Sequence, residues 1–383
     1  MSHAPIARVD NAADPYRWLE NRDSAEVLDY LKAENAYLEQ QLSEQLPLRE
    51  TLFEEIKARI RETDLSLPSP WGPYLYYQRT TAGDEYPRHY RCRKPADGAL
   101  TVDEASEQLL LDPNALADGG FISLGAFSIS PDHQRLAYSL DTSGEETYQL
   151  FVKELADDSL IELPFEECDG SMTWANDSQT LFFGELDDTH RPHKLYRHRL
   201  GTDAAELVFH EKDGRFFLSC YRSSSERQLI VHLGSKTTSE AWVLDAATPQ
   251  AAFSCVAPRE EGHEYDVDHG TLNGEWSWLI RSNQHGINFA LFSASESAPS
   301  RAHSPGCSRT CACCLEDDRA ARRRRRLRPV ATGVATGSSR IFFRWQPPAP
   351  DPAPAHRVCC CDQSCHAPHA RAARAPPVAS RAR

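Results

Sequence analysis

The stretch Ser130–Leu155 reads Ser-Pro-Asp-His-Gln-Arg-Leu-Ala-Tyr-Ser-Leu-Asp-Thr-Ser-Gly-Glu-Glu-Thr-Tyr-Gln-Leu-Phe-Val-Lys-Glu-Leu. It opens with a turn signal at Pro131-Asp132, because proline presets φ and aspartate can bond its own backbone. A short apolar run follows, and a polar loop with Gly144 leads to a second run in which Leu150 and Val152 are spaced with a period of two. The stretch therefore predicts a β-hairpin, and a single hairpin cannot bury its own apolar face.

The two runs of this hairpin recur along the chain. The first run occurs four times, in steps of 45, 48 and 49 residues, at 136–138, 181–183, 229–231 and 278–280. The second run keeps the same pace, at 150–152, 195–196, 242–244 and 290–292. A period of about 40 to 50 residues with short strands is typical of a β-propeller with one four-stranded blade per period. The alternative is a β-sandwich with coincidental spacing. The 222 residues from Trp71 to Phe292 suffice for four to five blades, fewer than a closed ring of six or seven needs.

An apolar helical pattern precedes the blades. Asp23-Ser24-Ala25-Glu26 has the form of a capping box, and leucines recur at helical spacing as far as Leu42. We expect one helix from about Ser24 to Gln45, broken at Pro47, and a second helix with an apolar side. A two-helix arm is too small to fold alone. It predicts a segment that packs on another domain, and the alternative is a cap on the propeller rim.

Charge and composition change abruptly near residue 300. Residues 301–383 contain 16 Arg, no Lys and five acidic groups, whereas residues 1–300 carry 26 basic and 51 acidic groups. We therefore predict three parts: a helical arm at 1–70, a partial propeller at 71–298, and a disordered, basic tail rich in Cys, Arg, Pro and Ala at 299–383. The tail consists largely of residues with GC-rich codons, so the simplest interpretation is a shifted reading frame that truncates the blade array.

Several stretches resemble the prolyl oligopeptidase family of serine peptidases, and its oligopeptidase B branch in particular. They span residues 5–296, and the most specific is Pro258-Arg259-Glu260-Glu261-Gly262-His263-Glu264-Tyr265-Asp266-Val267-Asp268-His269. The resemblance implies a propeller that covers an α/β-hydrolase domain, with the helical arm packed on the hydrolase. It also implies cleavage of short peptides after Arg or Lys.

The catalytic machinery of that family has no counterpart in the sequence. The family relies on a Ser-Asp-His triad whose serine lies on a Gly-x-Ser-x-Gly elbow. No Gly-x-Ser-x-Gly occurs among the 383 residues, and no alternating strand and helix pattern of a hydrolase domain is found. We therefore assign no catalytic, cofactor-binding or metal residue. For His263, His269 and His285 we expect a structural or interdomain role rather than catalysis.

The tail offers two other interpretations. The tail has enough Cys and His residues to bind zinc, but their spacing fits no paired Cys-x-x-Cys pattern, so we expect no metal site there. These residues are Cys307, Cys311, Cys313, Cys314, Cys359, Cys360, Cys361, Cys365, His366 and His369. The basic run Arg322–Arg326 could neutralise phosphates, but such runs are usually solvated, so nucleic acid is not the expected partner.

The sequence thus predicts the arm and partial propeller of an oligopeptidase-B-like serine endopeptidase, inactive by itself, with short peptides as partners and no cofactor. Two other classes stay open: a stand-alone propeller that binds a partner, and a basic-tailed nucleic-acid binder. Four scattered cysteines before residue 300, the absence of an apolar signal region and the absence of an 18-residue apolar run predict a cytoplasmic protein without a membrane span. We also expect the first and last blades to expose an apolar face.

Overall fold

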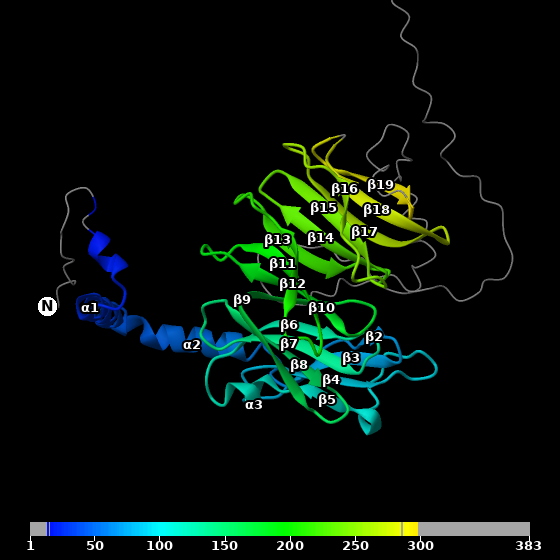
Figure 1. The fold of residues 1–383 in the computed structure, drawn as a ribbon. Helices are drawn as coiled ribbons and strands as arrows, with labels where there is room; N and C mark the ends of the chain where they lie inside the picture. Colours follow the sequence, from blue (N-terminus) through cyan, green and yellow to red (C-terminus); the bar gives the residue numbers. More distant parts are fainter. Residues whose placement is uncertain (1–13, 15, 285, 298–383) are drawn as a thin grey trace, which may run out of the picture. The chain divides into compact units, whose positions relative to one another are not determined.

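The computed structural model describes residues 14, 16–284 and 286–297 (Figure 1). The fold is mostly β, with four antiparallel sheets preceded by two helices. The predicted tail, its candidate zinc ligands and its arginine run lie outside the described residues.

The arm consists of the 3-10 turns η1 (Arg17–Glu20) and η2 (Ser43–Gln45) and the helices α1 (Ala25–Gln41) and α2 (Leu46–Lys57). The Ser24 side chain accepts the N–H of Val27 at 3.2 Å, so the N-cap lies one residue after the Asp23 that the capping-box pattern suggested. Pro47 lies in the first turn of α2, where its missing N–H is not needed. Pro47 therefore begins the second helix, whereas the first helix already ends at Gln41, before the predicted Gln45.

Blade 1 is a five-stranded sheet whose innermost part is split into two short strands. Its strands are β1 (Asp64–Leu65), β2 (Ser69–Trp71), β3 (Tyr74–Thr80), β4 (Arg88–Arg93) and β5 (Gln108–Leu111). Both β1 and β2 pair with β3, with Asp64 opposite Thr80 and Trp71 opposite Tyr74. The 3-10 turn η3 (Glu104–Ser106) and the short helix α3 (Pro113–Ala117) flank β5.

Blades 2 and 3 share one continuous sheet because a single long strand belongs to both. The strands are β6 (Ser123–Ile129), β7 (Arg135–Asp141), β8 (Tyr148–Glu154), β9 (Leu160–Trp174), β10 (Thr180–Leu186), β11 (Pro192–Arg199) and β12 (Ala205–His210). The first part of β9 pairs with β8 as the outer strand of blade 2, and its last part pairs with β10 as the inner strand of blade 3.

Blade 4 has four strands and blade 5 has three within the described residues. They are β13 (Phe217–Arg222), β14 (Gln228–Gly234), β15 (Ser239–Asp245), β16 (Ser254–Ala257), β17 (Tyr265–Leu272), β18 (Glu275–Ser282) and β19 (Ala290–Ser295). The hairpin predicted from Ser130–Leu155 is β7–β8, and its repeats are the second and third strands of the following blades. The predicted array of four to five blades is confirmed.

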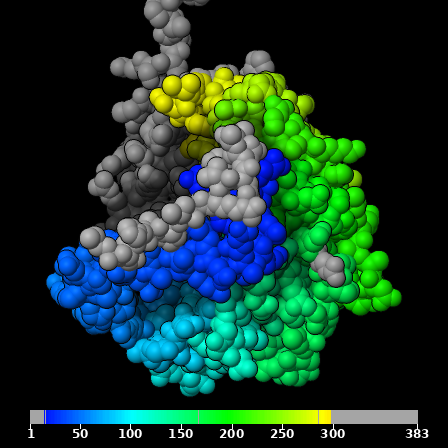
Figure 2. Space-filling model, turned by 90° about the vertical axis from the view of Figure 1, so that its left-hand side faces the viewer, coloured from blue at the N-terminus to red at the C-terminus, as the bar shows by residue number. Residues whose placement is uncertain are grey.

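Each blade shares its two faces with its two neighbours, because side chains along a strand alternate in direction. On β14, Leu229 and Val231 are fully buried in the core with blade 3, while Ile230 is fully buried in the core with blade 5. The same division holds on β7 and β10. Successive blades therefore lie side by side, as the colour sequence from cyan through green to yellow shows on the surface (Figure 2).

The expected exposed apolar face is absent from blade 1. Leu75, Tyr77 and Cys92 point away from blade 2, yet they are buried. Tyr90 and Val102 pack against them, and the Tyr77 hydroxyl donates to Glu107. The loop before β5, which contains Val102 and Glu107, thus covers this face. The predicted exposed apolar face is therefore wrong for blade 1, because a loop takes the place of a neighbouring blade.

Candidate functional site

One end of the propeller is marked by the point where the arm joins it. Because Asp64 lies opposite Thr80, the chain reaches blade 1 at the end where β3 turns into β4. In antiparallel blades the connections between successive blades lie at this same end. We call it the arm-side face, formed by residues 81–87, 112–122, 142–147, 187–191, 211–216, 235–238, 258–264, 283–284 and 286–289.

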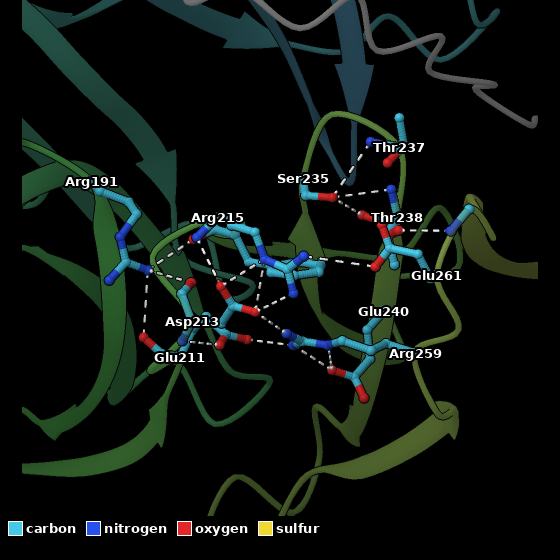
Figure 3. Close-up of polar contacts among 12 residues, drawn as sticks. Arg191, Glu211, Asp213, Arg215, Ser235, Thr237, Thr238, Glu240, Arg259 and Glu261 are labelled. Carbon is cyan, nitrogen blue, oxygen red and sulfur yellow. Dashed lines mark hydrogen bonds and ion pairs between the residues drawn. The ribbon is translucent and has the colours of Figure 1, made fainter.

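An ion-pair cluster on the arm-side face joins three blades around Arg259 (Figure 3). Arg259 Nη2 lies 2.5 Å from Glu211 Oε2 and 2.7 Å from Glu240 Oε2. Its guanidinium also lies over the Phe216 ring, 3.8 Å from the centroid. Glu211 follows blade 3, Glu240 lies in blade 4 and Arg259 precedes blade 5, so one side chain connects all three.

The turns around Arg259 are held by their own side chains. Asp187 accepts the N–H groups of Thr189 and Arg191, and the Arg191 guanidinium donates to the Phe216 carbonyl at 2.8 Å. Asp213 accepts the N–H of Arg215 at 3.0 Å. Such aspartate turns fix a loop without strand pairing.

A second set of contacts fixes the β14–β15 turn. Ser235 Oγ accepts the N–H groups of Thr237 and Thr238, and Thr238 Oγ1 accepts the N–H of Gly262. Above this turn the exposed pair Arg215 and Glu261 lies 3.7 Å apart. The buried part of the cluster is therefore rigid, while its outer charges face solvent.

The electrostatics of the cluster favour charged, mutually bound groups. Burial lowers the pKa of Arg259, but the hydrogen bonds that Arg259 donates to Glu211 and Glu240 outweigh it and raise the pKa above its usual value. Hydrogen bonds from Arg215 lower the pKa of Asp213 to about 2. The cluster can hold blades together and present charge, but it offers no nucleophile with a neighbouring base.

A serine, a histidine and a glutamate meet at the opposite end of blades 4 and 5. Ser225 Oγ lies 2.7 Å from His269 Nδ1, and His269 Nε2 lies 3.7 Å from Glu296 Oε1. The composition is that of a hydrolase triad, but the geometry differs. His269 is fully buried, and the Glu296 carboxylate pairs with Arg227 at 2.9 Å.

The remaining contacts of this group are structural. Ser225 Oγ accepts the Arg227 N–H at 3.2 Å, and the His269 ring stacks on Trp276. Burial lowers the pKa of His269, so the ring is neutral at physiological pH. His263 is also buried, with Nε2 2.8 Å from Ser282 Oγ. Each ring contacts a serine of another strand or turn, so a structural role for both stays a prediction, and His285 lies outside the described residues.

Other candidate chemistry is not found in the part of the chain that the structure describes. No group of three or more His, Cys, Asp or Glu residues is arranged to hold a metal ion among these residues. No described helix is both long and apolar enough to cross a bilayer. The sequence singled out the Arg259 stretch by resemblance alone. It missed Glu211 and Asp213, because partners 46 or more residues away carry no local signal.

Two solved structures that share this fold are of oligopeptidase B. Oligopeptidase B from Leishmania major superposes with a TM-score of 0.68 at 28% identity, covering 76% of this chain and 41% of that one. Oligopeptidase B from Trypanosoma brucei, with covalently bound antipain in a closed form, gives 0.65 at 29% identity, covering 75% and 40%.

Curated relatives give the same result. Protease 2 of Moraxella lacunata is 33% identical over 296 residues, which are 76% of this chain and 42% of that protein. Dipeptidyl aminopeptidase BI of Pseudoxanthomonas mexicana is 34% identical over 304 residues, covering 75% and 41%. The chain thus spans about two fifths of the length of these relatives. Residues 3–305 match the model of the prolyl oligopeptidase N-terminal β-propeller domain. The chain belongs to the prolyl oligopeptidase family, of which it holds the N-terminal propeller portion.

Proposed function

We propose that this chain supplies the arm and propeller of an oligopeptidase-B-type serine endopeptidase that cuts short peptides after Arg or Lys. The chain does not hydrolyse peptides by itself. One observation carries the proposal: the match to the family runs through arm and blades, while no Gly-x-Ser-x-Gly elbow occurs in the 383 residues. Two serines lie against histidines, Ser225 against His269 and Ser282 against His263, and both histidine rings are buried.

The charge of the arm-side face supports cationic substrates. Its loops carry many carboxylates and few basic groups. The acidic residues are Asp84, Glu85, Asp112, Asp118, Glu145, Glu146, Asp187, Asp188, Glu211, Asp213, Glu260, Glu261 and Glu264. A surface of one sign raises the local concentration of ligands of the other sign and speeds their association. Basic peptides would therefore collect where the arm joins the propeller.

The first test asks whether the chain is inactive alone. We expect no cleavage of an arginyl amide and no serine labelled by a fluorophosphonate. Residues 1–297 are then fused in place of the matching part of Protease 2 of Moraxella lacunata. The fusion should cleave an N-blocked arginyl amide. Labelling of the chain alone, or cleavage only of free-amine dipeptidyl substrates by the fusion, would contradict the proposal.

The second test concerns the acidic loops. In the fusion, Glu85→Gln, Asp188→Asn and Glu260→Gln together should lower kcat/KM for a peptide with several basic residues about 3-fold at low salt, because steering weakens. The value for a neutral-flanked peptide should not change. The control is Asp157→Asn, Asp203→Asn and Glu275→Gln at the other end of the blades. If the two triple variants changed kcat/KM equally for both peptides, the acidic loops would not favour basic substrates.

We also propose a cytoplasmic location, which the state of the cysteines supports. Cys92, Cys168, Cys220 and Cys255 are free thiols, and burial raises the pKa of Cys168 to about 12 and that of Cys255 to about 11. Such thiols are slow to oxidise. Fractionation of cells that produce the chain tests this location.

Retention of the chain on DNA that falls steeply with salt would instead favour the alternative function, a nucleic-acid binder.

A further inference from the structure

A hollow lies on the face of blade 3 that turns toward blade 2. Its volume is about 430 Å³, and its lining includes Pro164, Phe165, Glu167, Phe183, Glu185 and Tyr196. None of these residues belongs to the Arg259 cluster or to the group formed by Ser225, His269 and Glu296. The hollow is therefore a separate feature of the propeller.

One wall of the hollow is a continuous stack of three aromatic rings. Phe165 and Phe183 stack with centroids 4.7 Å apart at 26°, and Phe183 and Tyr196 stack at 5.7 Å and 14°. The faces of such rings carry partial negative charge and attract cations, and a planar guanidinium stacks on them well. The wall thus suits a flat cationic group.

The lining also holds a carboxylate fixed by an ion pair, that of Glu185. Glu185 Oε1 lies 2.5 Å from Lys194 Nζ, and both side chains are about three-quarters buried. Burial alone would raise the pKa of Glu185, but hydrogen bonds from Lys194 and Tyr196 lower it below its usual value. Glu185 is therefore anionic at neutral pH, and Lys194 is already committed to it.

Another part of the lining comes from β9, at the point where its pairing with β8 is interrupted. Leu163 pairs with Leu150 and Cys168 pairs with Tyr148, and β9 forms a bulge between these two pairs. Glu167 lies in this bulge with φ 54°, a left-handed conformation that non-glycine residues rarely adopt. Its side chain is exposed, and it has no ion-pair partner within the described residues. Strained backbone of this kind tends to persist at functional sites.

We propose that this hollow binds the guanidinium side chain of an arginine in a peptide, stacked on Phe165 and Tyr196 and paired with Glu167 and Glu185. The ligand class rests on the proposed function and deepens it: the propeller would hold a second basic residue of the substrate, away from the scissile bond. Two carboxylates, an aromatic wall and no uncommitted cation in the lining favour a cationic ligand over an acidic or apolar one.

The test measures binding to the full chain without hydrolysis. Acetyl-arginine amide is titrated by calorimetry against acetyl-citrulline amide, which has nearly the same shape but no charge. Arginine should bind about fivefold more tightly, the size of one partly exposed ion pair. Equal binding of the two probes, or no saturable binding of either, would overturn the proposal.

Two variants locate the binding. Glu167→Gln should bring the arginine and citrulline affinities together, and Phe165→Ala should weaken both. Asp203→Asn removes an exposed carboxylate from the turn before β12, outside the aromatic wall, and should change neither. If Phe165→Ala unfolds early in a thermal scan, Glu167→Gln alone decides. An unchanged arginine preference in Glu167→Gln contradicts the site, and since no cleavage is read, this failure is distinct from failure of the proposed peptidase activity.

Discussion

The arm and the blades differ in how far their apolar side chains are buried. In the blades the large apolar side chains are mostly buried between neighbouring sheets, as Phe182 and Leu229 are. In α1 and α2 only Val27 is buried, while Leu38 is 54% and Phe53 is 55% exposed. Both segments carry apolar residues at regular spacing, so the difference lies in what covers them.

This difference indicates which apolar surfaces are covered within the described residues. Each full blade finds its partner in the next blade, and even the outer face of blade 1 is closed by its own loop. The arm's apolar residues have no cover of comparable extent among the described residues. In monomeric proteins an apolar patch of this kind marks an interaction surface. We therefore propose that the apolar side of the arm packs on a surface that the described blades do not supply.

The largest expected contrast comes from two phenylalanines. Phe182→Ala in the blade 3–4 core should lower the free energy of unfolding by about 3–5 kcal/mol, because it removes a buried ring and leaves a cavity. Phe53→Ala in α2 should change it by less than about 0.5 kcal/mol. Urea unfolding of both variants measures the contrast, and similar losses would show that the arm is packed in the free chain.

The next contrast concerns ion pairs. Arg259→Ala leaves the carboxylates of Glu211 and Glu240 mostly buried without their cation, and should cost about 2–3 kcal/mol. The matched control is Arg281→Ala, whose pair with Asp266 is half exposed and should be worth at most about 1 kcal/mol. Chemical denaturation tests both. Equal losses would mean that the Arg259 cluster does not join the blades.

A pH dependence of similar size is expected from His89 in blade 1. Burial against Phe127 lowers its pKa to about 4. Between pH 6.5 and pH 4, His89 is mostly protonated in the unfolded chain but mostly neutral in the folded chain. The free energy of unfolding therefore falls as the pH drops from 6.5 toward 4. Between pH 7 and pH 5 the loss from this group is about 2 kcal/mol.

His89→Phe should remove that part of the acid destabilisation while keeping the ring contact with Phe127. His190→Gln, at an exposed turn, is the control and should leave the pH dependence unchanged. Unfolding curves at pH 7 and pH 5 give the difference. An unaltered pH dependence in His89→Phe would show that the ring is not desolvated in the folded chain.

The smallest effect on unfolding, but a clear one on association, is expected from the arm. Leu38→Gln with Ile56→Gln should change stability by less than about 0.5 kcal/mol, because both side chains are already exposed. The double variant should reduce concentration-dependent self-association in light scattering. Increased association would contradict the view that this apolar face is what other molecules contact.

Local pattern predicted much of this molecule. The period of the hairpin from Ser130 to Leu155 gave the blades, and leucine spacing gave α1, because strand and helix periodicity are short-range properties. The closure of blade 1 by Val102 and Glu107 was not predicted, since an irregular loop has no period. The partners of Arg259 were missed for the same reason, because contacts between blades join residues distant in sequence. The hollow beside Phe165 depends on a bulge in β9 that no residue pattern announces.

Amide hydrogen exchange of residues 25–57 tests the central claim most directly, that the arm lacks its partner surface in this chain. It is measured in the chain alone and in the fusion to the remaining part of Protease 2 of Moraxella lacunata. The account predicts fast exchange of α1 and α2 in the chain alone, at least tenfold slower exchange in the fusion, and unchanged exchange in β14. Arm amides that are already as protected as those of β14 in the chain alone would contradict it.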